Sequence, residues 1–139
     1  MVTMNPLNLV FHHFGLAVKQ PAPAIAFLSA LGCNIGEPVF DPEQNVHLLL
    51  CSRPDHPAVE IIYPGNGPGP VDALIERHTS GIIYHVCYET PDLAQTLEQF
   101  EKAGTRADCV SSPKPALLFH GRKVSFYRVK GMGLIEILE

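Results

Sequence analysis

The stretch Ile82-Ile83-Tyr84-His85-Val86-Cys87-Tyr88-Glu89 is the segment from which the fold of this chain is best inferred. It is rich in β-branched and aromatic residues and follows Ser80-Gly81, which is typical of a strand buried on both faces. One imidazole, that of His85, lies in its middle. Because a buried polar group without a partner costs about 1–3 kcal/mol, we expect the His85 side chain to bind a partner.

A similar apolar run, again with an imidazole inside it, occurs half a chain earlier at Phe11-His12-His13-Phe14-Gly15-Leu16-Ala17-Val18. A helical pattern and then three further strand patterns follow each run. His13 precedes Gly32 by as many residues as His85 precedes Gly104, and each glycine is suited to end a helix. An internal repeat of this size predicts two copies of strand-helix-strand-strand-strand.

The bounds of the predicted elements follow from local patterns. Strands are expected at 9–18, 35–40, 46–51 and 58–63 in the first copy, and at 82–89, 106–110, 123–129 and 134–138 in the second. One helix is expected after Gln20, and another with Thr90 as its N-cap. The proline- and glycine-rich segment 64–70 predicts a linker before a short helix at 71–78, and loops are expected at 53–57 and 113–115.

Composition limits the class of protein. A chain of 139 residues with 46% hydrophobic and 17% charged residues fits one compact domain. The net charge of −4 and the scattered basic residues predict no nucleic-acid partner, and no apolar run is long enough to predict a membrane span. The N-terminus lacks a signal-peptide pattern, and the four cysteines form no CxxC pair, so we expect reduced thiols in a cytoplasmic protein.

The last predicted strand of each copy carries one carboxylate among apolar neighbours, Glu60 in the first and Glu136 in the second. An isolated buried carboxylate is costly enough that it finds a cation or takes up a proton. These glutamates and His13 and His85 occupy matching places in the two copies. We therefore predict that all four bind one divalent metal ion, and mixed nitrogen and oxygen ligands suit Zn, Ni, Co, Mn or Fe.

A purely structural explanation of these four residues is also open. A histidine within an apolar strand is usually a core residue whose hydrogen bonds are satisfied, and a strand glutamate more often pairs with a cation such as Arg128 or Lys123. Four such residues in register favour the metal site. The adjacent His12 is expected to face the other side of its strand and is not a predicted ligand.

In these four residues and in its internal repeat, the chain resembles the vicinal oxygen chelate superfamily, which includes the glyoxalases and bleomycin-resistance proteins. The resemblance extends from about Leu9 to Glu139. The resemblance implies an α+β fold in which two βαβββ modules form a cupped eight-stranded mixed sheet with flanking helices. Module one would span about 9–64, a linker with a short helix 65–80, and module two about 81–139, within a single domain of residues 1–139. Metal ligands from the first and last strand of each module correspond here to His13, Glu60, His85 and Glu136.

Within the superfamily, the chain looks most similar to the methylmalonyl-CoA epimerases. The similar segments are 41–46, 76–78, 112–115, 119–126 and 133–136. The bacterial epimerase pattern carries a second, non-ligand glutamate after its Pro-Glu-Gln turn, and this position falls on Leu48 here. Inversion of a carbon needs an acid on one side and a base on the other, so Leu48 puts inversion in question. Leu48 is instead a candidate substrate contact.

The resemblance implies a metal-dependent isomerase or epimerase-like enzyme that abstracts an α-proton from an acyl thioester or 2-oxo substrate through a metal-stabilised enolate. Glu136 is the first candidate for the base and Glu60 the second. His120, Arg122 and Lys123 are candidates for binding the distal anionic part of a small-molecule substrate such as a CoA thioester, with surface solvation as the alternative. The family resemblance also implies a homodimer.

Three other functions are compatible with the sequence. A glyoxalase-type lyase of a glutathione hemithioacetal is one, although Ala26-Phe27-Leu28-Ser29 replaces a Phe-Tyr helix motif common in glyoxalases. A non-catalytic, drug-sequestering protein that binds small molecules is another, but such relatives usually lack the four ligands. An extradiol-type dioxygenase is the third, since its iron site uses two histidines and one carboxylate.

Overall fold

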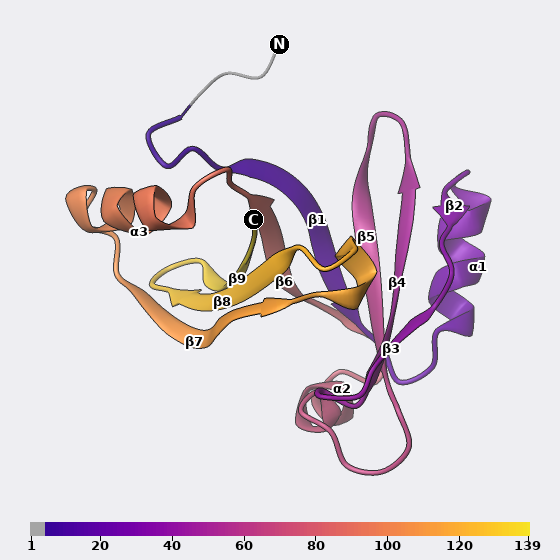
Figure 1. The fold of residues 1–139 in the computed structure, drawn as a ribbon. Helices are drawn as coiled ribbons and strands as arrows, with labels where there is room; N and C mark the ends of the chain where they lie inside the picture. The colour runs from indigo at the N-terminus through magenta and orange to yellow at the C-terminus, as the bar shows by residue number, and fades with distance from the viewer. Residues whose placement is uncertain (1–4) are drawn as a thin grey trace. The chain divides into compact units, whose positions relative to one another are not determined.

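The structure is a computed structural model that describes residues 5–139 (Figure 1). These residues form three α-helices, α1 (Ala22–Ala30), α2 (Asp72–Arg77) and α3 (Leu93–Lys102), and a short 3-10 helix, η1 (Leu117–Phe119). The nine strands of the mixed sheet are β1 (Val10–Ala17), β2 (Asn34–Ile35), β3 (Val39–Asp41), β4 (Val46–Arg53), β5 (His56–Pro64), β6 (Ile82–Glu89), β7 (Ala107–Pro115), β8 (Lys123–Val129) and β9 (Gly133–Leu138). The predicted α+β class is confirmed. No helix among the described residues is long and apolar enough to cross a membrane.

The chain divides into two compact units. The N-terminal unit comprises residues 13–84, and the C-terminal unit comprises residues 85–139 together with residues 5–12. The order of elements is β1-α1-β2-β3-β4-β5 in the first half of the chain and β6-α3-β7-η1-β8-β9 in the second, with α2 between the two. The predicted repeat is therefore present, whereas the single domain stays a prediction.

In the N-terminal unit the strand order is β2-β4-β5-β1, with β3 also pairing with β4. β1 and β5 run parallel, and the other pairs are antiparallel. Helix α1 lies along β4 and β5 (Figure 1), where Leu28 packs into a core with Leu49 and Ile61. Burial, with a smaller contribution from the nearby Cys33, raises the pKa of the Cys51 thiol in the same core. All four cysteines are free thiols.

The strand expected at 35–40 is divided into β2 and β3, which makes nine strands where eight were expected. Pro38 has no backbone N–H to donate to a ladder, so the pairing is interrupted there. Gly36 still donates its N–H to the Leu50 carbonyl at 2.9 Å, and a Cβ at this position would lie 2.6 Å from that oxygen. The close approach of the two backbones therefore requires glycine at this point.

Two loops are shorter than expected. β4 ends at Arg53 and β5 begins at His56, so most of the predicted 53–57 loop is strand, and Asp55 adopts a left-handed conformation (φ 61°) in the turn. β7 continues through the expected 113–115 loop, with register shifts between Cys109 and Lys114. An edge strand tolerates prolines because half of its backbone groups face away from the ladder, and β7 is such an edge.

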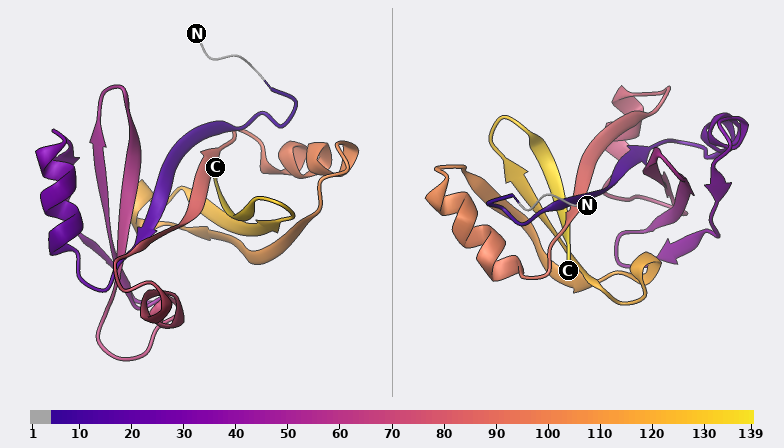
Figure 2. Two further views of the ribbon diagram at one scale, coloured as in Figure 1. Left: turned by 180° about the vertical axis from the view of Figure 1, so that it is seen from behind. Right: turned by 90° about the horizontal axis from the view of Figure 1, so that it is seen from above.

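In the C-terminal unit the strand order is β6-β9-β8-β7, and β6 and β9 are parallel. Helix α3 packs against this sheet (Figure 2) through a core that contains Phe100, Tyr127 and Ile137. Its N-cap is Asp92, whose side chain accepts the Gln95 N–H at 3.1 Å. Thr90, the expected N-cap, is instead buried.

Buried hydroxyls connect α3 to the N-terminal segment of the same unit. The Thr96 hydroxyl donates to the Leu7 carbonyl at 2.9 Å and lies 2.9 Å from the Thr90 hydroxyl. We expect Thr96→Val to lower the free energy of unfolding by about 1–3 kcal/mol, because it removes the hydrogen bond to the Leu7 carbonyl and the contact with the Thr90 hydroxyl, which keeps its hydrogen bonds to Asp92. Urea denaturation would measure the change. Thr105→Val is the control, since Thr105 makes no side-chain hydrogen bond among the described residues, and an equal loss in both variants would contradict this role.

Candidate functional site

In the N-terminal unit, parallel strands bring together His13 of β1 and Glu60 of β5. Gly15 is directly opposite Glu60 in the register, and His13 precedes Gly15 by two residues. Alternate residues of a strand share a face, so His13 and Glu60 project from the same side of the sheet. Both side chains are buried, and His13 Nε2 lies 3.8 Å from Glu60 Oε1.

The C-terminal unit repeats this arrangement with His85 of β6 and Glu136 of β9. Cys87 is directly opposite Glu136, and His85 precedes Cys87 by two residues. Both side chains are again buried, and His85 Nε2 lies 3.4 Å from Glu136 Oε1. The Phe126 ring packs edge-on against the His85 ring with centroids 5.5 Å apart. The internal repeat therefore extends from the backbone to the polar side chains.

The spacing within the His85–Glu136 pair matches that of two metal ligands, and the spacing within the His13–Glu60 pair is somewhat wider. A charge-assisted N–H···O bond is about 2.7–2.9 Å long, shorter than the 3.8 Å and 3.4 Å separations. Two ligand atoms at about 2.1 Å from one ion and at a tetrahedral angle lie roughly 3.4 Å apart. Imidazole nitrogen and carboxylate oxygen are also suitable ligands for a divalent transition metal. The residues of both pairs thus fit a metal by chemistry, and His85 and Glu136 fit it by distance as well.

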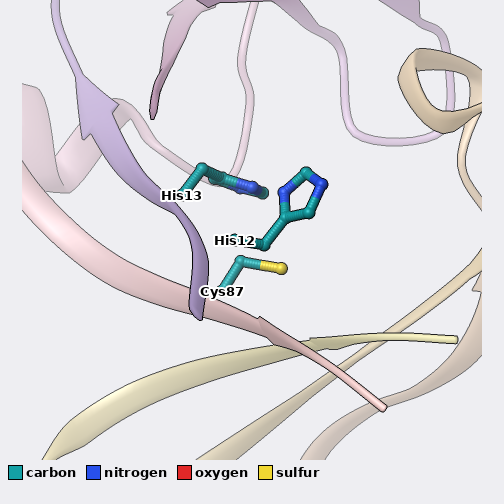
Figure 3. A group of neighbouring side chains, drawn as sticks. All are labelled: His12, His13 and Cys87. Carbon is teal, nitrogen blue, oxygen red and sulfur yellow. The ribbon is translucent and has the colours of Figure 1, made fainter. Parts of the chain in front are cut away.

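Cys87 is a neighbour of the His85–Glu136 pair that the sequence patterns did not single out. Its side chain is fully buried and shares the face of His85 and Glu136. The His12 and Cys87 ligand atoms lie within 4.8 Å of each other (Figure 3), and the His12 ring also packs edge-on against Phe119. The period of two from His85 to Cys87 is the signal that would have identified this thiol.

Leu48 lies on the face of the N-terminal unit that carries Glu60. Leu50 is directly opposite Glu60, and Leu48 precedes it by two residues on β4. Leu48 packs beside the buried Val46. This face therefore presents an aliphatic side chain where the epimerase pattern has its second glutamate.

His47 projects from the other face of β4. Its ring lies between Phe40 and Tyr63, with centroids 4.9 Å from each. Stacking against Tyr63, with an interplanar angle of 16°, fixes the ring away from Glu60. His47 therefore does not replace the glutamate that is absent at position 48.

The three candidate contacts for a distal anion lie at the start of β8 in the C-terminal unit. Arg122 is already engaged, because it donates to the Glu139 carbonyl at 2.8 Å and to the Glu89 carboxylate at 3.0 Å. His120 adopts a left-handed conformation (φ 56°) after η1, and Lys123 begins β8. All three are exposed, but only His120 and Lys123 make no side-chain hydrogen bond or ion pair among the described residues.

Comparisons with known proteins show which proteins this chain is similar to. The chain is similar to the ethylmalonyl-CoA/methylmalonyl-CoA epimerase of Cereibacter sphaeroides, with 28% identity over 129 residues that cover 91% of this chain and 94% of that protein. The crystal structure of methylmalonyl-CoA epimerase from Mycobacterium tuberculosis has a TM-score of 0.78 at 17% identity, and the match covers 100% of this chain and 92% of that one. A methylmalonyl-CoA epimerase in complex with methylmalonyl-CoA and NH4+ has a TM-score of 0.70 at 17% identity, over 94% and 93% of the two chains.

These structural matches show that the chain has the same fold as the solved epimerases. The family described as the Glyoxalase/Bleomycin resistance protein/Dioxygenase superfamily matches residues 12–126, which is most of the chain. The chain belongs to this superfamily.

Proposed function

We propose that this protein is a metal-dependent, epimerase-like enzyme that removes an α-proton from an acyl thioester or 2-oxo substrate. The observation that carries the proposal is the buried His–Glu pair, which occurs at the same strand register in each unit. Similarity to a protein that is named as an epimerase adds support for the reaction class. A buried His–Glu ion pair with no catalytic role is the alternative, because both N···O distances also lie within the 4 Å of an ion pair.

The proposed metal ligands are His13, Glu60, His85 and Glu136, two from each unit, acting on one divalent ion of Zn, Ni, Co, Mn or Fe. Such an ion supplies a Lewis acid that stabilises the negative charge of an enolate. The histidines are neutral nitrogen donors, and the glutamates offset the charge of the ion. The low polarity of the surrounding strands strengthens these interactions, because water does not screen them.

Glu136 is the proposed base, with Glu60 as the second choice. A carboxylate that binds through one oxygen keeps a second oxygen with which it can accept a proton from the α-carbon. Inversion of that carbon also requires return of a proton from the opposite side. Leu48 cannot supply it, so epimerisation would need Glu60 as the acid. Otherwise the enzyme catalyses exchange or isomerisation without inversion.

The substrate that we propose is a CoA thioester, in keeping with the CoA esters in the names of the relatives. Leu48 would contact the acyl group, and His120 and Lys123 would bind the distal phosphates. Arg122 would bind a phosphate only if it gave up its hydrogen bond to the Glu89 carboxylate. We further propose that the enzyme is a cytoplasmic homodimer.

Solvent deuterium uptake tests this function directly. The chain, incubated with methylmalonyl-CoA in D₂O, should introduce one deuterium at the α-carbon faster than buffer does, and a chelator should abolish the difference. Mass spectrometry follows the label, and elemental analysis follows the metal. Conversion of a glutathione hemithioacetal without thioester exchange would assign the chain to the lyases instead. Tight thioester binding without any exchange would assign it to the non-catalytic binding proteins.

A further inference from the structure

A cavity of about 380 Å³ lies in the C-terminal unit, on the side of the sheet that packs against α3. Tyr88 of β6 and Ile135 of β9 line it, and these residues are adjacent in sequence to Cys87 and Glu136. Successive residues of a strand face opposite sides of the sheet. The cavity is therefore separate from the His85–Glu136 pair, on the other face of the same two strands.

The wall of this cavity is mainly apolar and carries no charge. Leu7 and Leu9 of the N-terminal segment, Phe100 of α3 and Ile135 of β9 are among its apolar residues, and none of the described residues that line it is charged. An ionised ligand would lose its hydration here without gaining an opposite charge, which is costly. An apolar ligand would instead displace water from an apolar surface, which is favourable. The cavity thus selects for an uncharged molecule.

Two hydroxyl groups provide the polar contacts available to such a ligand. Among the described residues, Tyr88 and Thr105 line the cavity and make no side-chain hydrogen bond. The Tyr88 ring is held by an edge-on contact with Phe11, with centroids 6.3 Å apart. The amide of Asn5 is not available, because it exchanges hydrogen bonds of 2.8 Å and 3.2 Å with the Leu9 backbone.

We propose that this cavity is a second ligand site, for an uncharged single-ring phenol. Its volume is near the lower end of the range of about 300–1,000 Å³ for small-molecule pockets, and an apolar cavity of about 150 Å³ already holds benzene. A substituted ring therefore fits with room to spare. The ring packs against Leu7 and Phe100, and its hydroxyl bonds to Tyr88 or Thr105. The site is independent of the proposed epimerase-like activity.

Titration of the full chain with p-cresol tests this proposal. Calorimetry should show saturable binding of one molecule per chain, and the melting temperature should rise with p-cresol concentration, because the ligand binds only the folded state. The anion 4-hydroxybenzoate, which has a similar ring, should bind at least tenfold more weakly. Equal binding of the two compounds, or no saturable binding of p-cresol, would overturn the proposal.

Two tryptophan variants locate the site. Met132, which lines the cavity, and Leu117, which does not, are each 62% exposed and belong to the same unit. Met132→Trp should fill the mouth of the cavity and weaken p-cresol binding at least tenfold, whereas Leu117→Trp should change it less than twofold. Equal effects would mean that p-cresol binds elsewhere.

Two further variants identify the contacts and the occupant. Thr105→Val should weaken the binding of p-cresol more than that of toluene if the Thr105 hydroxyl contacts the ligand; Tyr88→Phe repeats the comparison for the other hydroxyl. If neither variant separates the two ligands, the phenol-specific part of the proposal is wrong. A last outcome would also overturn the proposal: p-cresol binds to a chain that lacks residues 1–4 but does not bind to the full chain. The occupant of the cavity would then be the N-terminus of the protein itself.

Discussion

Replacing His85 by alanine is expected to remove most of the divalent ion from the protein, and His13→Ala should do the same. Each substitution deletes a direct ligand in the proposed site, whereas the loss of a residue that only orients a ligand already costs about 10–100-fold in metal affinity. We therefore expect affinity to fall at least 100-fold. Elemental analysis after gel filtration measures occupancy, and thermal denaturation with and without chelator measures the linked stability.

His47→Ala is the matched control for these variants. His47 is also a partly buried strand histidine of the N-terminal unit, but its ring stacks on Tyr63 away from Glu60. This variant should keep its metal and its response to chelator. Normal occupancy in both His13→Ala and His85→Ala would exclude the proposed ligand set. A different outcome would identify a buried ion pair in place of a metal site: the parent protein contains no metal, and His85→Ala lowers its free energy of unfolding by about 3–5 kcal/mol.

The central strands of each copy could be predicted because their patterns are strong. The expected strand at 82–89 is β6, and that at 123–129 is β8, with the same bounds. The errors lie in edge segments, where pairing of a few backbone groups outweighs local composition. β7 includes the prolines of a predicted loop, and the segment around Pro38 interrupts a predicted strand. Such positions are determined by the neighbouring strand, which a local pattern does not contain.

The helix cap shows the same limit at the level of a single hydrogen bond. Thr90 and Asp92 are both good N-cap residues, so composition alone does not choose between them. The structure selects Asp92, since the Thr90 hydroxyl is buried against Thr96, six residues further along the chain. A local pattern likewise could not predict the hydrogen bond between Arg122 and Glu89, because the two residues are 33 positions apart in the sequence.

The His–Glu pairs were predictable for the opposite reason. A histidine or glutamate inside an apolar strand differs so much from its neighbours that burial itself requires a partner. In each parallel pair of strands, the glutamate then lies opposite the residue that follows the histidine by two positions, on the same face of the sheet. The strand pattern does not distinguish Cys87, because a buried cysteine behaves as a small apolar residue and does not interrupt that pattern.

Glu136→Gln is expected to lower turnover of the thioester by about 100-fold or more, which is within the usual range for loss of a general base. Glutamine keeps the size of the side chain and a carbonyl oxygen that can still contact a metal, but it lacks the basicity that proton transfer requires. Some metal and substrate binding should therefore survive. Steady-state rates, measured together with metal content and the affinity for substrate, separate loss of the base from loss of the ion.

Glu60→Gln is the matched comparison, because Glu60 occupies the same register in the N-terminal unit and faces His13 as Glu136 faces His85. If Glu60 acts mainly as a ligand, its loss should reduce turnover less than the loss of Glu136 once rates are corrected for metal content. A larger effect of Glu60→Gln would exchange the roles of the two glutamates. Turnover by Glu136→Gln at the parent rate, with metal bound, would show that another residue moves the proton and that the proposed mechanism is wrong.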